Sequence, residues 1–387
     1  MIPQKKEKRN RGGKKTMHVL LAPDSFKGTL SAREVCEIEA RAICDVLPDA
    51  RVTMLPMADG GEGMVDACLS LFGGERTACR VTGANGNPVD AAYALLPDGS
   101  AAIEMAAAAG LPLMRGRLDP LHATTYGVGE LLRDAQRRGA KRILLGLGGS
   151  ATNDCGIGIA AVLGWRFLDE VGVEVAPLAE NLGEIAAIEP PREPFGVEVL
   201  AACDVDNPLL GEQGATYVFG PQKGVTEAIK LRLEAGMAHF AAVLKKTFPT
   251  FDAAAPGTGA AGGMGAAVVT FLGGTLRPGI ELLLDAAKFD ALAAVADLVI
   301  TGEGRMDAQS LHGKVPCGVA KRAKRAGKPC IAICGALGDG AETLREVGIT
   351  AFYAASHGKR TMDKLQKTCR KELYEVTKTA ISEQIKK

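Results

Sequence analysis

The chain has 387 residues, 47% of them hydrophobic, and its 46 Lys and Arg almost balance its 45 Asp and Glu, for a formal net charge of +1. This composition excludes a disordered chain and argues against sequence-independent nucleic-acid binding, and the length predicts about two or three domains. No uncharged apolar run reaches the roughly 18 residues that a membrane-spanning helix needs, so no membrane partner is expected. Glycine is over-represented, with 48 residues, and the excess is gathered in clusters. These clusters direct the search for a site.

The first 16 residues form a basic leader with seven Lys or Arg and one Glu. The leader lacks the apolar stretch of a signal peptide. We expect a disordered, solvated leader over 1–16 ahead of a working start at Met17, because a strand is predicted directly afterwards. A nucleic-acid-binding arm is the alternative that its charge leaves open.

The ten cysteines are scattered, and none forms a C-x-x-C pair or clusters with the five histidines. Several lie in apolar segments such as 328–335, where a thiol acts as a small hydrophobic side chain. With no secretory segment, we expect reduced thiols, a cytoplasmic protein and no structural zinc site.

From Met17 the chain alternates short apolar strands with helices. Strands are predicted over 18–22 and 51–55, and a helix follows each of them; Ser31 and Glu34 form a capping box at the start of the first helix. Such alternation with short turns is typical of a parallel sheet.

The alternation stops after Phe72 and returns near Asp297. Residues 75–104 instead predict several short strands with Gly, Asn and Pro turns. The other predicted strands span 142–145, 197–202, 297–301, 329–334 and 349–354, and the other predicted helices span 124–138, 226–246, 315–326, 341–347 and 361–385.

This pattern predicts an α/β protein in which one domain is interrupted by another. One doubly wound, parallel-sheet domain is formed by both chain ends, over 17–73 and 286–387. A second domain is inserted between them, over 74–285.

Ligands of open parallel sheets bind beyond the carboxyl ends of the strands, in the loops that lead into helices. The first such loop places Asp24, Ser25 and Lys27 ahead of a helix start. A carboxylate, a hydroxyl and an ammonium in this position suit a metal-bound phosphate group. The alternative is that Asp24 and Ser25 only satisfy the backbone of the turn.

The loop after the second strand, 57–63, holds Asp59 and Glu62 among three glycines. Glycines allow the backbone to approach a ligand closely, and the two carboxylates suit Mg²⁺ or a hydroxyl group. A tight turn whose Glu62 caps the next helix is the competing interpretation.

The most informative stretch is 145–158, LGLGGSATNDCGIG. A buried strand leads into Gly148 and Gly149, then into a polar run that includes Ser150 and Asn153, and then into a helix. Backbone N–H groups of such a loop point together at the positive end of the helix, which favours an anionic ligand. Close packing of small residues explains the glycines but not the polar run.

Two charged side chains follow in the middle of the chain. Asp204 lies at a strand end, in CDVDNP, and Lys223 lies in GPQKG, just ahead of a long helix. A carboxylate and a helix-start lysine suit phosphoryl transfer, although each is common separately.

Another candidate loop, 301–307, follows a buried strand near the C-terminal end. Gly302 and its small neighbours leave the guanidinium of Arg305 able to reach a carboxylate or a phosphate. A salt bridge of Arg305 with Glu303 or Asp307 is the alternative.

One glycine motif is a decoy. The G-x-G-x-x-G at 257–262 follows no predicted strand, and the first strand–helix turn has no such glycines, so we do not interpret it as a dinucleotide site. Taken together, glycine turns with Asp, Lys and Arg indicate a magnesium nucleotide or a small phosphorylated anion.

Seven blocks of the chain, in order, resemble the glycerate kinase family, namely the bacterial glycerate 2-kinases of the glyoxylate and glucarate pathways. They are APDSFKGTLSA (22–32), MADGGEGMVDA (57–67), GGSATNDCGIG (148–158), CDVDNPL (203–209), FGPQKG (219–224), RPGIELLLD (277–285) and DLVITGEGRMD (297–307). The resemblance spans about 17–358. Gly28 and Cys155 depart from the family's usual residues, which are acidic and glycine-like at these positions.

The resemblance implies a flavodoxin-like domain interrupted by a smaller mixed α/β domain, and phosphorylation of D-glycerate to 2-phosphoglycerate with ATP and Mg²⁺. It implies a small-molecule substrate, no nucleic acid and no membrane, in a monomer or homodimer. The alternatives are phosphorylation at the 3-hydroxyl or of another small hydroxy acid, a nicotinamide oxidoreductase, and a small-anion sensor without turnover.

Individual roles are predicted from the needs of phosphoryl transfer, which are cations on the phosphates, a carboxylate for Mg²⁺ and another near the attacking hydroxyl. We predict catalytic roles for Lys27 and Lys223 as phosphate cations, for Asp204 as base or hydroxyl orienter, and for Arg305 on the substrate, with Asp24 on the metal. The other assignments are substrate contacts by Ser150, Asn153, Asp59 and Glu62, and phosphate contacts by Ser25, Gly148, Gly149 and Gly302.

Overall fold

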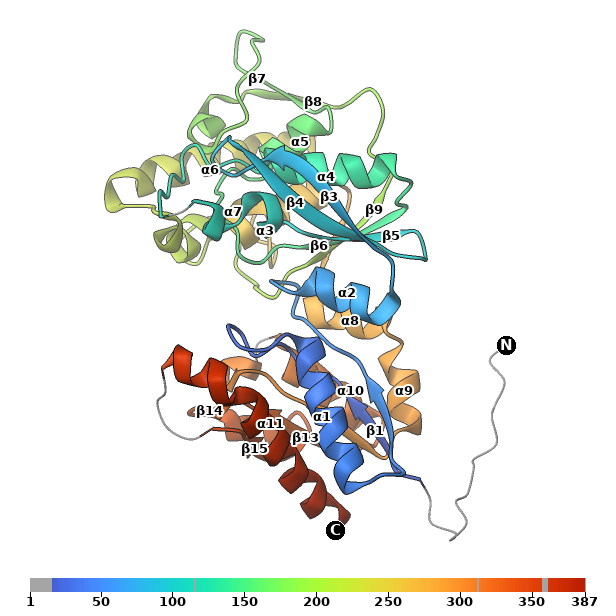
Figure 1. Cartoon of the computed structure of the whole chain (residues 1–387). Helices are drawn as coiled ribbons and strands as arrows, with labels where there is room; N and C mark the ends of the chain where they lie inside the picture. Colours follow the sequence, from blue (N-terminus) through green and yellow to red (C-terminus); the bar gives the residue numbers. More distant parts are fainter. Residues whose placement is uncertain (1–15, 115, 312, 357–360, 387) are drawn as a thin grey trace. The chain divides into compact units, whose positions relative to one another are not determined.

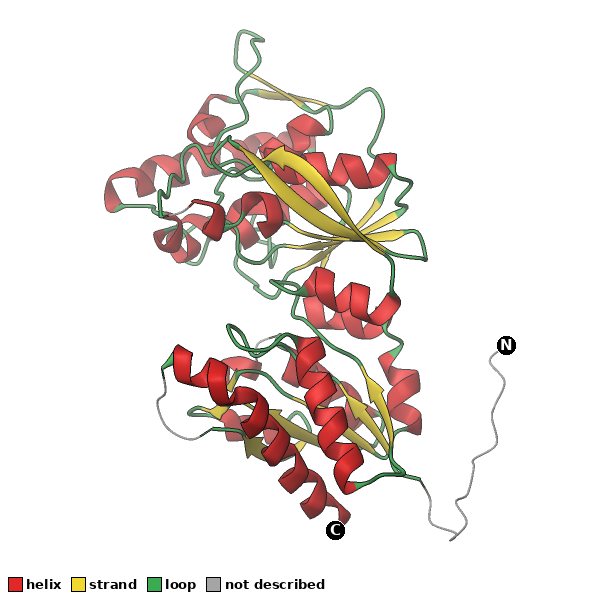
Figure 2. Cartoon of the chain, viewed as in Figure 1, coloured by secondary structure: helices red, strands yellow, loops and turns green. Residues whose placement is uncertain are grey.

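The computed structural model describes residues 16–114, 116–311, 313–356 and 361–386, so the predicted basic leader lies, except for Thr16, outside the described residues. The chain forms two compact units, each of the α/β class (Figures 1 and 2). A terminal unit contains the chain up to Ala58 and from Leu283 onward, and an inserted unit contains Asp59–Leu282.

The terminal unit is built on five parallel strands. They are β1 (His18–Leu21), β2 (Arg51–Met54), β11 (Leu298–Thr301), β13 (Cys330–Cys334) and β15 (Ile349–Ala354). Their order in the sheet is β15-β13-β11-β1-β2. Counted along the unit this is the order 2-1-3-4-5 of flavodoxin-like sheets, which reverses between β1 and β11. The predicted fold class is therefore confirmed for this unit.

Four helices accompany this sheet: α1 (Ala32–Val46), α9 (Phe289–Val295), α10 (Val315–Arg325) and α11 (Met362–Ile385). The N-terminal and C-terminal segments of this unit are in contact here, because α1 and α11 pack against each other (Figure 1). In addition, α9 packs against α10. The capping box of Ser31 and Glu34 at the start of α1 is present as predicted. A short parallel pair, β12 (Arg305–Met306) and β14 (Ala336–Leu337), extends the loops at the carboxyl ends of β11 and β13.

The inserted unit contains a six-stranded mixed sheet. Its strands are β3 (Glu75–Thr82), β4 (Pro88–Leu95), β5 (Ser100–Glu104), β6 (Arg142–Gly146), β9 (Glu198–Ala202) and β10 (Thr275–Arg277), in the order β10-β9-β6-β5-β4-β3. The four strands from β5 to β10 are parallel, and β4 and β3 add an antiparallel hairpin at one edge. The mixed sheet that the sequence predicts for this unit is thus present.

Helices of the inserted unit are α2 (Met64–Phe72), α3 (Ala106–Ala109), α4 (Tyr126–Arg137), α5 (Ile157–Val162), α6 (Glu227–Thr247) and α7 (Ala260–Thr270), while α8 (Gly279–Ala286) crosses the unit boundary. A small hairpin of β7 (Arg166–Leu168) and β8 (Ala187–Glu189) lies beside α6 (Figure 1). Phe167, Phe240 and Phe271 pack edge to face or tilted in the core of this unit.

The unit boundary differs from the predicted one at α2. The structure divides the chain after Ala58 rather than after residue 73, because α2 packs on β4 and β5 of the inserted sheet. Glu104 at the end of β5 fixes it there, since its Oε1 accepts a hydrogen bond of 2.8 Å from the backbone N–H of Val65 in the first turn of α2. The inserted unit is also the longer of the two, contrary to the smaller insertion that we expected.

Two further predictions need correction. The helix predicted over 341–347 is a short 3₁₀ helix, Ala341–Arg345, that follows a left-handed glycine. In α7 the residues Ala261–Gly263 have left-handed backbone angles inside the helix, a conformation that hydrophobic periodicity does not reveal. Every helix in the described part of the chain is too short or too polar to cross a lipid bilayer.

Glu39, in the middle of α1, is fully buried, and neither carboxylate oxygen has a hydrogen-bond partner within the described residues. Burial raises the pKa of this carboxyl well above its usual range. Because the carboxyl binds its proton more tightly in the folded state than in the unfolded state, its contribution to stability is greatest below the unfolded-state pKa. This contribution to the free energy of unfolding then falls as the pH rises toward the folded-state pKa. Glu39 therefore destabilises the terminal unit increasingly as the solution becomes less acidic.

We expect Glu39→Leu to raise the free energy of unfolding by about 1–3 kcal/mol near neutral pH, because it removes an unsatisfied polar group from the core. Glu39→Gln, which does not titrate, should remove only the pH dependence. Urea unfolding midpoints at about pH 5 and about pH 8 measure both effects. A Glu39→Leu variant less stable than the wild type at the higher pH would contradict this account.

Candidate functional site

In the terminal unit, the loops that follow β1 and β11 meet where the strand order of the sheet reverses. The backbone N–H of Asp24 donates to the carbonyl of Gly302 at 2.8 Å, and Thr301 Oγ1 donates to the carbonyl of Ala22 at 2.8 Å. A Cβ on Gly304 would lie 3.1 Å from the Cα of Phe26, so the two loops touch directly. This is the position at which open α/β sheets bind ligands.

The predicted side chains of the first loop differ in exposure. Asp24 is 4% exposed, and its Oδ1 accepts a hydrogen bond of 2.6 Å from the backbone N–H of Ser25. Ser25 is half-buried, and Lys27 is exposed. The loop that follows β1 thus carries a buried carboxylate, Asp24, and an exposed cation, Lys27.

The loop after β1 offers a single buried carboxylate to a Mg²⁺ ion. In the described residues no three His, Cys, Asp or Glu side chains converge as a metal cage. Mg²⁺ usually keeps its waters and binds one or two carboxylates together with substrate phosphates. A single buried carboxylate such as Asp24 matches that mode of binding.

In the loop after β11, Arg305 makes the salt bridge with Asp307 that was the alternative to a ligand contact. Arg305 is exposed, and its Nε lies 3.4 Å from Asp307 Oδ2, a surface ion pair of small energetic value. Glu303 is buried instead, accepts a short hydrogen bond of 2.5 Å from Ser310 Oγ and pairs with Lys314 Nζ at 3.5 Å. Burial raises the pKa of Glu303. From the sequence, Glu303 was considered only as a salt-bridge partner of Arg305 and Lys314 only as a cation near a predicted helix start, and neither was assigned a site role.

In the inserted unit, three loops meet at the carboxyl ends of β6, β9 and β10. An added Cβ on Gly60 would lie 2.3 Å from the Cβ of Ala202, and one on Gly148 would lie 2.7 Å from the Cα of Gly61. A Cβ on Gly279 would lie 2.1 Å from the carbonyl oxygen of Asp59. The glycines that the sequence shows here are therefore required for close backbone packing.

This packing holds two of the predicted carboxylates at the sheet end. Asp59 Oδ1 accepts a hydrogen bond of 3.2 Å from the backbone N–H of Gly61. Asp204 is exposed, and its Oδ1 accepts a hydrogen bond of 2.9 Å from the backbone N–H of Gly279. Each carboxylate is thus oriented by a backbone N–H group of a neighbouring glycine.

Glu62 does not cap α2, which was the competing interpretation. The N-cap of α2 is Gly63, without a side-chain hydrogen bond, and the carboxylate at this helix start comes from Glu104. Glu62 is exposed beside the glycine turn. A capping role therefore does not account for it.

The glycine loop after β6 brings Ser150 and Lys223 together. Gly149 is exposed and has φ of 75°, whereas the next residue, Ser150, is only 5% exposed. Lys223 Nζ donates to Ser150 Oγ at 2.8 Å and to the carbonyl of Thr152 at 2.8 Å. Two residues selected separately from the sequence are thus direct partners.

Asn153 belongs to this loop, but its side chain points into the protein interior. It is fully buried, and its Nδ2 donates to Thr216 Oγ1 at 3.4 Å. Its Oδ1, like Thr152 Oγ1, is buried with no hydrogen-bond partner among the described residues. The direct substrate contact predicted for Asn153 stays a prediction, and the structure gives its side chain a buried position.

The decoy glycines support the same loop. Gly262 and Gly263 have φ of 74° and 89°, and the carbonyl of Gly262 accepts a hydrogen bond of 3.0 Å from the backbone N–H of Cys155. An added Cβ on Gly262 would lie 2.1 Å from the carbonyl oxygen of Thr152. These glycines are a packing surface for the loop after β6 and do not follow a strand.

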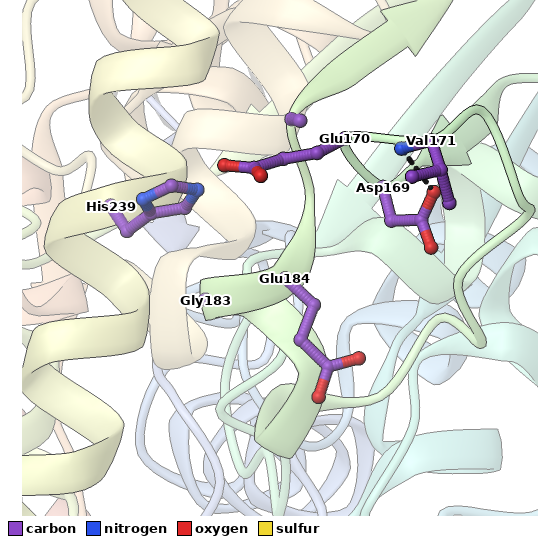
Figure 3. Close-up of a pocket in the computed structure, with 7 residues that line it drawn as sticks. Asp169, Glu170, Val171, Gly183, Glu184 and His239 are labelled. Atoms are coloured by element: carbon purple, nitrogen blue, oxygen red, sulfur yellow. Dashed lines mark hydrogen bonds between the residues drawn. The ribbon is translucent and has the colours of Figure 1, made fainter.

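The thirteen predicted site residues therefore form two groups, each at the carboxyl ends of its own sheet. Asp24, Ser25, Lys27, Gly302 and Arg305 belong to the terminal unit, and Asp59, Glu62, Gly148, Gly149, Ser150, Asn153, Asp204 and Lys223 belong to the inserted unit. A surface pocket of about 350 Å³ lies elsewhere on the inserted unit, lined by Asp169, Glu170, Val171, Gly183, Glu184, Ala186 and His239 (Figure 3). It contains none of these thirteen residues.

Comparison with known proteins identifies the family of this chain. Residues 19–385 match the family model described as the glycerate kinase family. The chain is 45% identical to a glycerate kinase of Halalkalibacterium halodurans over 87% of this chain and 90% of the relative. It is 42% identical to a glycerate 2-kinase of Escherichia coli over 90% and 92% of the two chains.

A solved structure is similar as well. A crystal structure from Salmonella typhimurium LT2, provisionally assigned as a glycerate kinase 2, aligns with a TM-score of 0.86 and 40% identity over 95% of this chain and 98% of that one. The resemblance seen in the seven sequence blocks is thereby confirmed, and the chain belongs to the glycerate kinase family.

Proposed function

We propose that this protein transfers the γ-phosphoryl group of MgATP to the 2-hydroxyl of D-glycerate, giving 2-phosphoglycerate and ADP. The observation that carries the proposal is the family match over residues 19–385, together with 42% identity to a relative named glycerate 2-kinase. The unpaired state of all ten cysteines supports a cytoplasmic location.

The terminal unit supplies the groups that suit the nucleotide. A Mg²⁺ ion held by this unit would supply positive charge to neutralise the phosphates during transfer. Asp24 would hold this ion, Ser25 and Gly302 would contact phosphate, and Lys27 would supply a cation. Lys27 is suited to this task because its side chain is exposed and directly follows the loop of Asp24.

The inserted unit supplies the groups that suit glycerate. Ser150 would bind the substrate, with Asn153 behind it and the carboxylates of Asp59 and Glu62 at the margin of the site. Asp204 would orient the attacking hydroxyl or accept its proton, since its carboxylate is held at a strand end by the backbone of Gly279. Gly148 and Gly149 would offer backbone N–H groups to phosphate, and we keep Arg305 of the terminal unit as a ligand of the substrate.

One assay distinguishes the proposed kinase activity from the alternative functions. We expect purified protein to release ADP from MgATP only when D-glycerate is present, and to stop when EDTA removes Mg²⁺. ADP release with other small hydroxy acids but not with D-glycerate would assign another substrate. Binding of D-glycerate without ADP release would contradict the kinase proposal and favour a small-anion sensor.

A further inference from the structure

Lys223 is an unusual lysine because it is buried among neutral groups. Its side chain is 2% exposed and lies in the short 3₁₀ turn Pro221–Lys223, ahead of α6. Its two hydrogen bonds, each 2.8 Å, go to the hydroxyl of Ser150 and the carbonyl of Thr152. An ammonium group in such a setting lacks the paired carboxylate that usually accompanies a buried charge.

Asp154, whose charge acts on Lys223, accepts hydrogen bonds from other donors. It is fully buried and accepts hydrogen bonds of 2.8 Å from the N–H of Thr125, 2.8 Å from Thr125 Oγ1 and 3.1 Å from the N–H of Gly156. Asp154 therefore ties the loop after β6 to the start of α4. It offsets little of the cost of charging Lys223.

Other titratable groups on the surrounding segments are Cys155, Glu234 and Arg117. Burial raises the pKa of the Cys155 thiol, so this group stays neutral. Glu234 accepts a hydrogen bond from the backbone of Gly211, and Arg117 is exposed. Burial lowers the pKa of Lys223 to about 7, and only Asp154 acts in the opposite direction.

The contact between Lys223 and Ser150 can be made in two directions. When Lys223 is charged, Nζ donates to Ser150 Oγ, and the hydroxyl proton of Ser150 is free to point outward. When Lys223 is neutral, its lone pair can accept that hydroxyl proton, and Ser150 has no proton to offer a ligand. The protonation state of Lys223 thus decides whether Ser150 is a donor toward the surface of the loop.

We propose that Lys223 is a conditional cation, neutral in the ligand-free protein in weakly alkaline solution and charged by uptake of a solvent proton when the carboxylate of the substrate accepts a hydrogen bond from Ser150. The step forms one N–H bond at Nζ with a proton taken from a buffer acid or hydronium in solvent, which is left as its conjugate base, and Ser150 reverses its hydrogen bond. The identity of the substrate as D-glycerate rests on the function proposed above. Because binding is coupled to protonation of Lys223, the pair of Lys223 and Ser150 favours an anionic ligand over a neutral polyol.

The proposal predicts proton uptake on binding. Calorimetric titration of the protein with D-glycerate, in two buffers of different protonation enthalpy, measures the number of protons taken up. We expect uptake to approach one proton per bound D-glycerate at pH 8 and to be small at pH 6, with the affinity falling by up to about tenfold per pH unit as the solution becomes more alkaline. D-glycerate does not titrate in this range, and glycerol serves as the neutral probe that should cause no uptake.

Three variants assign the uptake to this pair. Lys223→Arg keeps a permanent charge, so binding should persist with no uptake and a flat pH dependence. Ser150→Ala leaves the lysine in place but removes the hydroxyl that links it to the substrate carboxylate, so proton uptake should also vanish. This smaller change provides the test if the lysine variant does not fold. Lys245→Met is the matched control, because Lys245 also donates to backbone carbonyls but is exposed, and uptake should remain.

The outcomes separate this inference from the proposed function. ADP release with D-glycerate but no proton uptake at pH 8, or uptake that survives Ser150→Ala, would overturn the conditional cation and leave the kinase proposal intact. Proton-linked binding of D-glycerate without ADP release would support the conditional cation and contradict the kinase proposal.

Discussion

Replacement of Lys27 by alanine should lower kcat by about 10²–10³-fold while leaving the fold intact. Phosphoryl transfer is accelerated mainly by fixed charges that stabilise the transferring group, and Lys27 is the cation that follows β1 beside the Asp24 carboxylate. Because the side chain is exposed, its loss removes little packing. Steady-state ADP release with D-glycerate measures the change in kcat, and urea unfolding midpoints report on the fold.

Two variants serve as controls for Lys27. Lys27→Arg keeps the charge and should retain more activity than the alanine variant. Lys371→Ala removes an exposed lysine from α11 and should leave kcat unchanged. A Lys27→Ala enzyme with nearly wild-type kcat would remove Lys27 from the mechanism.

Replacement of Gly302 by alanine should have the largest effect on stability, a loss of at least about 3 kcal/mol in the free energy of unfolding. An added Cβ would lie 1.7 Å from the carbonyl oxygen of Ile333 in β13, far inside contact distance. Neither atom can move alone, since both belong to the backbone of adjacent parallel segments. The carbonyl of Gly302 also accepts the N–H of Asp24, so a shift would displace the candidate metal ligand.

Gly327→Ala is the matched control for this effect. Gly327 has φ of 66° and no atom within 4 Å of an added Cβ, so the variant should lose only about 1 kcal/mol through backbone strain. Urea unfolding of both variants gives the comparison. Equal losses of stability would contradict the steric argument.

The α/β alternation of the terminal unit was predictable because several of its strands, such as Leu298–Thr301 and Cys330–Cys334, are short buried apolar runs. Buried parallel strands such as 330–334 need apolar side chains on both faces, and this is visible in one sequence. The place of α2 was not predictable. Its attachment depends on Glu104, which lies 39 residues from its partner Val65, and no local pattern shows this pairing.

The candidate site was predictable in its residues but not in its pairings. Glycine turns with polar side chains after strands pointed to Ser150 and, separately, to Lys223, yet their hydrogen bond spans 73 residues. The burial of Lys223 was also hidden, because a lysine at a helix start is usually exposed. Cys155 illustrates a further limit: its φ of 51° is a conformation that glycine adopts more easily, which accounts physically for the glycine-like residue usual there.

The most direct test of the account is the phosphorus NMR spectrum of the product formed from MgATP and D-glycerate. We predict a signal of 2-phosphoglycerate, appearing together with ADP and absent when D-glycerate is omitted. A signal of 3-phosphoglycerate alone would keep the kinase but contradict the assignment of the 2-hydroxyl as acceptor. An unchanged ATP spectrum would contradict the central claim that this protein phosphorylates glycerate.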